Sequence, residues 1–488
     1  MRKRIPTAAL VVLALSLVLV ACGGGGGAKA PTATVAAEID ATVAFWEARA
    51  EGDPSDYLSR NRLGNALLRR ARLSGDVADY RRAEIAFGES LATLPENLDG
   101  LIGMAFVAVA QHRFGEALLL AERVTAADPG EPAAYAVQGD ALLALGRYPE
   151  AREAYAKLHA LAPSLASFAR LAELAEITGD IESATIAWRN ALSFSQGRPD
   201  NRVWALVGFA DFRFAIGDLD GAAKLYEEAL DAQPDYLQAF TGSARVAAAN
   251  GDFDAAIARY ETVVRRLPTP EHILALADLY GATDRAEAAG QQRALVFAIA
   301  DLYAANGIAL DLTMALFLAD YGDPVEAVKL ADGAYAARPS VHAADALAWA
   351  LSQAGRHREA AAYSDEALRL GTPDARFLYH AGVIRLRLGQ PDEARRLLTA
   401  ALDLNPHFFV TEAEHAQSLI DRIDDERRLG QRSLAHPGCC GGDRRPRPRR
   451  RAPTGGTGAS AGELHGERLR RDRPPRRCDS HPLRRGYG

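Results

Sequence analysis

The chain has 488 residues, 48% of them hydrophobic and 25% charged, which is typical of a soluble protein with room for two or three domains or one long repeat array. The formal net charge of −6 is unevenly divided, because the segment from Arg432 to Gly488 holds 15 Arg and 5 acids, a local charge of +10. The residues before it therefore carry −16, which argues against nucleic-acid binding. Three of the four cysteines lie in this basic tail, and the fourth is Cys22. The body between them therefore has no disulfide framework and no thiolate metal site.

The N-terminal stretch MRKRIPTAALVVLALSLVLVACGGGGG has the pattern of an export signal. Three basic residues precede an apolar run, Ala8 to Ala21, that is shorter than the ~20 residues of a membrane-spanning helix. The sequence LVAC that ends at Cys22 resembles the lipobox of bacterial lipoproteins. The resemblance implies diacylglyceryl transfer to the Cys22 sulfur and cleavage before it.

Five glycines follow Cys22 and suit a flexible tether, because glycine runs do not pack. We therefore expect residues 1–21 to be a lipoprotein signal peptide and residues 22–32 to be the lipidated cysteine and its tether. The mature protein would be exported and lipid-anchored to the outer face of the bacterial cytoplasmic membrane, or to the outer membrane of a diderm cell. An ordinary cleaved signal and an uncleaved anchor helix are the alternatives.

From residue 33 to 428 apolar residues recur at i, i+3, i+4 and i+7, which predicts amphipathic helices and no strands. The chain also repeats itself, since Pro95, Pro129 and Pro163 follow one another at intervals of 34 residues. A period of this length predicts an array of similar units rather than separate domains.

One unit, residues 131–163, shows the physics of the repeat. Its first helix carries Gly139, Gly146 makes the turn, and its second helix carries Ala151 and Tyr155. Gly139 and Ala151 are expected to be small because two antiparallel helices cross closely there, while Tyr155 fills the groove toward the next pair. Gly146 can adopt the left-handed conformation that ends a helix.

This pattern resembles the tetratricopeptide repeat over most of the mature chain, and similar units recur about ten times. The resemblance implies an all-α, right-handed α-solenoid of stacked antiparallel helix pairs. We expect a half unit at the N-terminal end, carrying Ala41, Phe45 and Ala48, and a capping helix over roughly residues 407–428. Residues 269–307 depart most from the pattern, because their second helix runs on, and we expect a break or kink there.

No catalytic constellation is found in the repeats, and the sequence predicts no enzyme activity, no cofactor and no metal site. There is no phosphate-binding glycine loop and no nucleophile elbow. The histidines of the body are scattered singly, and each is expected at the surface or its boundary: His112, His159, His272, His342, His357, His380, His407 and His415.

The concave face of such repeats is lined by the first helix of each pair. The register places seven candidate partner-binding residues there: Asp140, Glu173, Trp204, Asp211, Arg245, Trp349 and Tyr379. Aromatic side chains beside charges suit an extended peptide or a partner helix. The alternative is that Trp204 and Trp349 only pack between adjacent repeats.

Two functions from different classes follow. The first is a membrane-anchored scaffold that recruits or organises protein partners through its concave face. The second is an accessory subunit of a membrane transport system whose chemistry lies in another chain. An enzyme of unrecognised type ranks last.

Residues 429–488 are rich in Arg, Pro and Gly, a composition that cannot bury a core and is typical of disorder. A nucleic-acid arm would suit the positive charge but not an exported protein. A zinc site built from Cys439, Cys440, Cys478 and His481 lacks any C-x-x-C pair. An anionic-lipid patch needs no cysteines.

A further interpretation is that this tail is read out of frame. Suitable codons allow the next frame to encode an apolar export segment and then AHPLGNFT, which resembles the mature start of some bacterial nickel/cobalt-type transport membrane proteins. The hypothesis is that the gene runs by overlap or frameshift into a downstream gene, whose product would be a candidate partner. It requires an open +1 frame across this part of the DNA.

Overall fold

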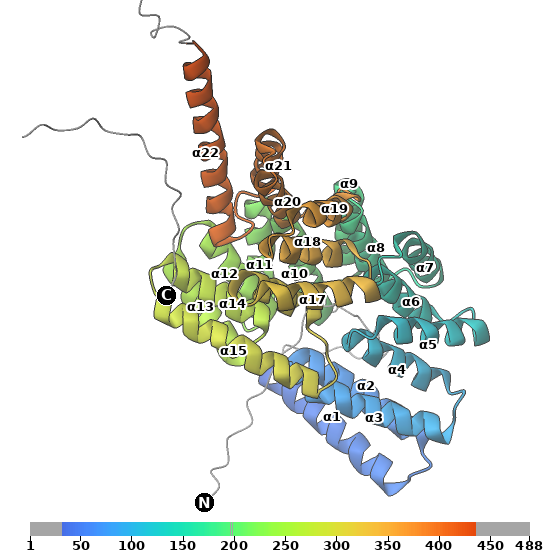
Figure 1. The fold of residues 1–488 in the computed structure, drawn as a ribbon. Coiled ribbons are helices and arrows are strands. Elements are labelled where there is room, and N and C mark those ends of the chain that lie inside the picture. Colours follow the sequence, from blue (N-terminus) through green and yellow to red (C-terminus); the bar gives the residue numbers. More distant parts are fainter. Residues whose placement is uncertain (1–31, 196, 198, 436–488) are drawn as a thin grey trace, which may run out of the picture. The chain divides into compact units, whose positions relative to one another are not determined.

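The structure is a computed structural model that describes residues 32–195, 197 and 199–435, and this part of the chain is all helical, with 22 helices and no strand (Figure 1). The predicted signal peptide, Cys22, and the tail with Cys439, Cys440, Cys478 and His481 lie outside the described residues. The repeats fall in one compact unit that ends at Gly430.

The first eleven helices are α1 (Thr32–Gly52), α2 (Tyr57–Ser74), α3 (Ala78–Thr93), α4 (Leu98–Ala110), α5 (Phe114–Ala127), α6 (Pro132–Ala144), α7 (Tyr148–Leu161), α8 (Leu165–Ile177), α9 (Ile181–Phe194), α10 (Pro199–Ala215) and α11 (Leu219–Ala232). The others are α12 (Leu237–Ala249), α13 (Phe253–Arg266), α14 (Pro270–Ala282), α15 (Ala286–Ala305), α16 (Asp311–Tyr321), α17 (Pro324–Ala337), α18 (Val341–Gln353), α19 (His357–Leu368), α20 (Ala375–Arg387), α21 (Pro391–Leu404) and α22 (Val410–Ala435).

Each even-numbered helix from α2 to α20 packs most closely with the helix that follows it, which makes ten pairs between α1 and α22. The predicted all-α solenoid of about ten repeats is thereby confirmed. The unit at residues 131–163 is the pair α6 and α7, and α1 is the expected extra helix at the N-terminal end.

The two helices of a pair cross where a glycine meets a large side chain. In the pair α6/α7, a Cβ on Gly139 would lie 2.1 Å from the Tyr155 ring. A similar contact joins neighbouring pairs, because a Cβ on Gly242 of α12 would lie 2.1 Å from the Tyr226 ring of α11. Tyr155 and Tyr226 are almost completely buried. The predicted close crossing at Gly139 is confirmed, and its physical basis is that only hydrogen fits under the ring.

The array also contacts itself over long sequence distances. The turns inside four consecutive pairs, from α4/α5 to α10/α11, each meet the connector that follows α15, α17, α19 or α21. Four hydrogen bonds join them: His112 Nδ1 with the Ala309 carbonyl oxygen at 2.8 Å, the Val341 amide to the Tyr148 hydroxyl at 2.9 Å, the Thr372 hydroxyl to the Ile177 carbonyl at 2.6 Å, and the Asn405 side-chain amide to the Phe214 carbonyl at 2.7 Å. We call these the docking contacts.

Glycine makes three of the docking contacts sterically possible. Gly146, Gly179 and Gly217 have φ of 74°, 76° and 79°, in the left-handed region. A Cβ on each would lie 2.4, 2.6 and 2.3 Å from a carbonyl oxygen of the facing connector, that of Pro339, Gly371 and Leu404 respectively. These turns therefore need glycine for their conformation and again for close approach.

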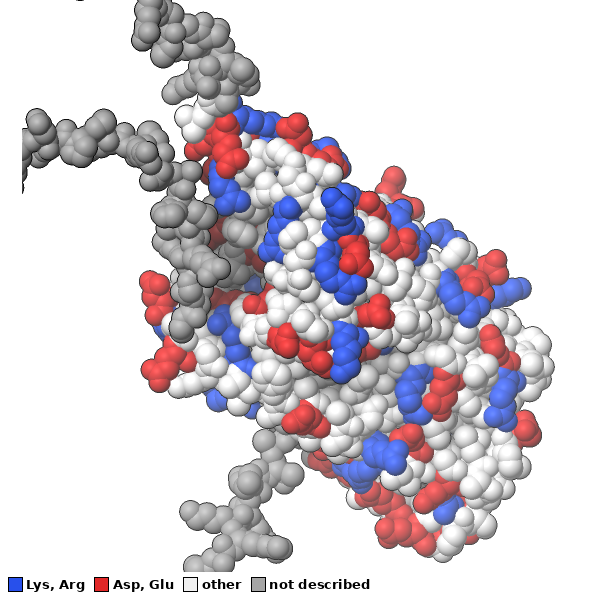
Figure 2. Space-filling view, viewed as in Figure 1, with Lys and Arg blue, Asp and Glu red and all other residues white. Residues whose placement is uncertain are grey.

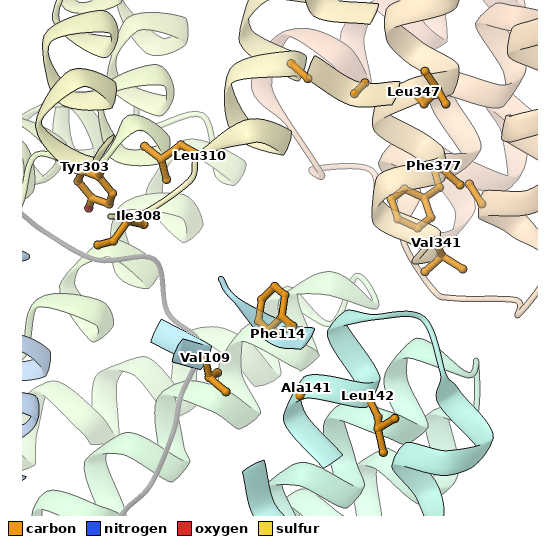
Figure 3. Close-up of a cluster of buried hydrophobic side chains, with 14 of the residues drawn as sticks. Val109, Phe114, Ala141, Leu142, Tyr303, Ile308, Leu310, Val341, Leu347 and Phe377 are labelled. Carbon is orange, nitrogen blue, oxygen red and sulfur yellow. The ribbon is translucent and has the colours of Figure 1, made fainter. Parts of the chain in front are cut away.

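Hydrophobic side chains bury this contact. Figure 3 shows one shared cluster with Val109, Phe114, Ala141 and Leu142 from the earlier segments and Ile308, Leu310, Val341 and Phe377 from the later ones. Segments nearly 200 residues apart thus share one core.

The expected irregularity is found after α15. This helix has 20 residues, whereas α13 has 14. The last turn of α15 leads through residues 306–310 into α16, and α15 and α16 do not pack closely side by side as most consecutive helices do. At the C-terminal end α22 continues past the expected end at Arg428 to Ala435.

The docking contacts predict that replacing glycine by alanine lowers the free energy of unfolding by different amounts at two turns whose glycines have similar φ. Gly355 has a φ of 78° and no atom within 4 Å of a Cβ, so Gly355→Ala carries only the backbone cost, about 1–2 kcal/mol. Gly146→Ala adds a clash with the Pro339 carbonyl and should cost a further 1–3 kcal/mol or so. Urea unfolding of both variants measures the difference. Equal costs would contradict docking at this turn.

Candidate functional site

A cavity of about 900 Å³ lies on the face formed by first helices of the pairs. Its walls come from α6, α8, α14, α16, α18, α20 and α22. His112, Ala309 and Arg338, at or beside the docking contacts, also line it. The docking contacts therefore close one side of what would otherwise be an open face.

The cavity wall is acidic, with nine Asp and Glu against three Arg. Three of the acids are paired with arginine: Asp140 with Arg170, Asp278 with Arg293, and Asp311 with Arg338. Six acids have no arginine partner among the described residues: Glu173, Glu176, Glu271, Asp320, Asp345 and Glu412. On the face shown in Figure 2, acidic and basic side chains are interspersed.

Two of these carboxylates have no hydrogen-bond donor among the described residues, namely Glu173 on α8 and Glu412 on α22. Oε2 of Glu412 is shielded from solvent and unpartnered. Burial, reinforced by the Asp140 charge, raises the pKa of Glu173 to about 7. Burial also raises the pKa of Glu412 to about 7, although the His380 and Arg376 charges oppose the rise.

Two other carboxylates accept hydrogen bonds from tryptophan. Nε1 of Trp349 donates to Asp320 at 2.7 Å, and Nε1 of Trp188 donates to Glu176. Burial raises the pKa of Glu176 to about 8, with the Trp188 hydrogen bond acting in the opposite direction. The tryptophans thus orient carboxylates at the cavity without neutralising them.

The prediction that His380 lies at the surface or its boundary is wrong. His380 is buried, stacks on Trp349 with ring centroids 4.1 Å apart, and has Nδ1 3.0 Å from both oxygens of Asp345. Burial opposes its protonation, but the Asp345 carboxylate outweighs burial and raises the pKa of His380. The contact spans α18 and α20, so sequence spacing alone could not reveal it.

Four of the seven candidate partner-binding residues line the cavity together: Asp140, Glu173, Trp349 and Tyr379. The other three, Trp204, Asp211 and Arg245, do not line it. Trp204 is half-buried beside Trp188, 6.1 Å between ring centroids, in the contact of α9 with α10. Trp349 is buried and stacks on His380 of the next pair. Both tryptophans therefore pack between adjacent repeats, and Trp349 lines the cavity as well.

Asp140 is at the centre of a side-chain hydrogen-bond network, and a similar network recurs later in the array. Arg170 donates to both Asp140 oxygens, at 2.8 and 2.9 Å, and the Tyr155 hydroxyl donates to the same carboxylate at 2.9 Å. In the second network, Tyr226 donates to Asp211 at 2.5 Å, and Arg245 bonds both of them. The two networks tie successive first helices together.

Asp278, Asp311, Asp345 and Glu412 were not among the residues predicted from the sequence. Asp278 occupies the same repeat position as Asp140 and Glu173, because each lies six residues before the positive-φ residue of its turn, which is Asp284, Gly146 and Gly179 respectively. Following that position through the repeats would therefore have found Asp278. It does not predict Asp345, which lies ten residues before Gly355, or Asp311, which is the first residue of α16.

Two features are absent from the described residues. In this part of the chain no helix is both long and apolar enough to span a membrane. The described residues also contain no group of three or more His, Cys, Asp or Glu placed to hold a metal ion.

The two networks predict that removing the Asp140 carboxylate lowers the free energy of unfolding more than removing the Asp211 carboxylate. The side chains of Arg170 and Asp140 are 3% and 5% exposed, whereas those of Arg245 and Asp211 are 36% and 50% exposed. Asp140→Ala leaves a buried guanidinium unpaired and should cost about 3–5 kcal/mol. Asp211→Ala should cost about 1 kcal/mol. Chemical denaturation tests the order, and a larger loss for Asp211→Ala would contradict it.

The raised pKa values of the cavity carboxyls predict that the free energy of unfolding falls as the pH rises above 6.5. Their ordinary pKa is 4.5, and in the folded chain it is about 7 for Glu173 and Glu412 and about 8 for Glu176. The folded form therefore holds more protons than the unfolded form in this range, so stability is lost as the pH passes through 7 and 8.

Glu173→Gln and Glu412→Gln should each reduce this loss by something of the order of 1 kcal/mol between pH 6.5 and 9. Glu122→Gln, on an exposed helix surface, is the control. Thermal unfolding across this pH range measures the effect. An unchanged pH slope in both cavity variants would refute the assignment.

Family models of known proteins match parts of the repeat region. A tetratricopeptide repeat model matches residues 213–280, and a second model of the same description matches residues 103–166 and 346–407. No curated protein matches the sequence.

Several solved structures are similar at low identity. A thermophilic TPR protein of Thermus thermophilus is 20% identical, with 39% of this chain and 98% of that chain covered and a TM-score of 0.35. The human IFIT1 dimer with PPP-AAAA is 17% identical, covering 64% and 73%, with a TM-score of 0.44. PilF of Pseudomonas aeruginosa is 17% identical, covering 43% and 90%, with a TM-score of 0.33. The three segments that the family models match show that this chain contains tetratricopeptide repeats.

Proposed function

We propose that the protein is a lipid-anchored, extracytoplasmic scaffold whose repeat face receives a segment of a protein partner. The observation that carries this proposal is the cavity on the face of the first helices, with polar groups that the described residues do not satisfy. Oε2 of Glu412 and Nε of Arg376 are buried without a hydrogen-bond partner among these residues, and Glu173 on the same wall receives no hydrogen bond from them. Buried polar groups are normally satisfied, so unsatisfied ones in a cavity wall favour a ligand.

Binding rather than catalysis fits the polar groups present. The His380–Asp345 pair is the arrangement closest to a catalytic one, but the only hydrogen-bond partner of His380 among the described residues is Asp345. Its ring is also stacked on Trp349. The pair therefore joins α18 to α20 rather than activating a nucleophile.

The proposed anchor rests on the sequence before the repeats. The lipobox-like LVAC, the apolar run before it and the five glycines after it support lipidation at Cys22. The partner would then be another protein at the same membrane surface. An accessory role in transport differs in its partner, so a pull-down from detergent-solubilised membranes separates the two: one integral membrane protein favours the transport role, and assorted soluble partners favour the scaffold.

Cys22→Ser should abolish anchoring. The wild-type protein should enter the detergent phase in phase partitioning, and its mass should show a diacylglycerol-modified N-terminus at Cys22. Cys22→Ser should lose both properties, because serine cannot accept the thioether-linked lipid.

Cys439→Ser and Cys440→Ser are the matched controls and should partition like the wild type. Detergent-phase partitioning of Cys22→Ser would indicate an uncleaved anchor helix instead. An aqueous wild-type protein would indicate an ordinary cleaved signal.

A further inference from the structure

We propose that the cavity is a cation site that receives the guanidinium or ammonium group of an arginine or lysine side chain on the partner. This inference rests on the proposed function for the identity of the partner. The cation site itself rests only on the geometry of the cavity.

The net charge of the cavity wall decides whether a ligand there should be a cation or an anion. Among the described residues, six of the nine acids form no ion pair with arginine, and two of the three cavity arginines, Arg376 and Arg387, form none with a carboxylate. Arg387 is already bonded to Ser352 at 2.8 Å and to Gln353 at 3.0 Å. An anion entering this space would meet more like charge than opposite charge, whereas a cation would meet the reverse.

Glu173 and Glu412 are the groups left for the ligand. Neither receives a hydrogen bond from the described residues, and Oε2 of Glu412 is shielded from solvent. A buried carboxylate oxygen without a donor, such as Oε2 of Glu412, is unfavourable, and a charge-assisted hydrogen bond from a ligand removes that cost. The Arg376 charge lowers the pKa of Glu412, but among the described residues no ion pair joins the two side chains.

The aromatic walls show that guanidinium groups fit this space. Four arginines of the chain already lie near cavity rings: Arg293 at 4.2 Å from the centroid of Tyr321, Arg376 at 5.2 Å from Phe409, Arg387 at 5.5 Å from Trp349, and Arg338 at 5.9 Å from Phe114. Tyr379 also lines the cavity, but its ring is buried against other aromatic side chains. Aromatic rings attract cations through their faces, which adds to the carboxylates.

Size and access favour a side chain over a whole helix. The volume of about 900 Å³ lies within the usual range of ligand pockets, roughly 300–1,000 Å³. Tyr321 and Phe409 line the cavity and are 43% and 42% exposed, so solvent reaches it. A long basic side chain with its neighbouring residues is of a suitable size, while the docking contacts close one side to a longer segment.

Isothermal titration calorimetry of the full mature chain at pH 8 tests the proposal, because carboxyls with a pKa of about 7 are mostly ionised there. The probes are N-acetyl-arginine amide and the neutral isostere N-acetyl-citrulline amide, with agmatine as a free amine. We expect saturable binding of the arginine probe and no binding of the citrulline probe.

Two sets of variants locate the binding. Glu173→Gln with Glu412→Gln should weaken binding of the arginine probe by about tenfold or more, since charge-assisted hydrogen bonds are lost. Glu122→Gln should have no effect. Arg387→Gln removes a cavity cation and should bind the probe at least as tightly as the wild type. Melting curves show whether each variant is folded.

The possible outcomes have distinct meanings. Equal binding of citrulline, or no effect in the folded double variant, would overturn the cation site. Binding of agmatine without the arginine probe would overturn the partner side chain and assign a free amine. If the double variant still captured the same partner in the membrane pull-down, the scaffold function would stand and this inference would fail.

Discussion

The structure depends on the docking of repeat turns onto connectors nearly 200 residues further along the chain. The turn glycines Gly146, Gly179 and Gly217 allow a carbonyl oxygen to approach to distances that no Cβ would tolerate. Each docking contact is small, but four occur at successive repeats and a shared hydrophobic cluster joins them. Without them, the inward face would be an open groove. With them, it becomes a partly closed cavity.

Enclosure changes the chemistry of the inward position. A carboxylate on an open groove is hydrated and ordinary, whereas Glu173 and Glu412 are half-buried in the cavity wall, and burial raises the pKa of each to about 7. The repeat position of Glu173 is occupied in the preceding pair by Asp140, where Arg170 and Tyr155 satisfy the charge. One position in the repeat therefore serves structure in one place and is left free for a ligand in another.

Much of the fold follows from the repeat itself. The 34-residue period and the small residue at the helix crossing predict the pair α6/α7, the close contact of Gly139 with Tyr155, and the irregularity after α15. The docking contacts could not be predicted in this way. The period describes how one pair packs on the next, but the small rotations that add up along the array are set by side-chain packing at every interface.

The candidate site was only partly predictable for the same reason. Asp140, Glu173, Trp349 and Tyr379 were found from register, and following the position of Asp140 through the repeats would have added Asp278. Register does not tell which acids are paired, because Arg170 and His380 reach their partners from neighbouring helices. Trp204 and Asp211 share the inward register but lie outside the cavity.

The docking itself is tested most directly by hydrogen exchange at the Val341 amide. This residue is the first of α18, where the helix supplies no acceptor, and the amide donates instead to the Tyr148 hydroxyl at 2.9 Å. We predict slow exchange in the wild type and faster exchange in Tyr148→Phe, with no change at the Ala343 amide, which Ser340 caps at 3.2 Å. Fast exchange of Val341 in the wild type would contradict a docked array and, with it, an enclosed cavity.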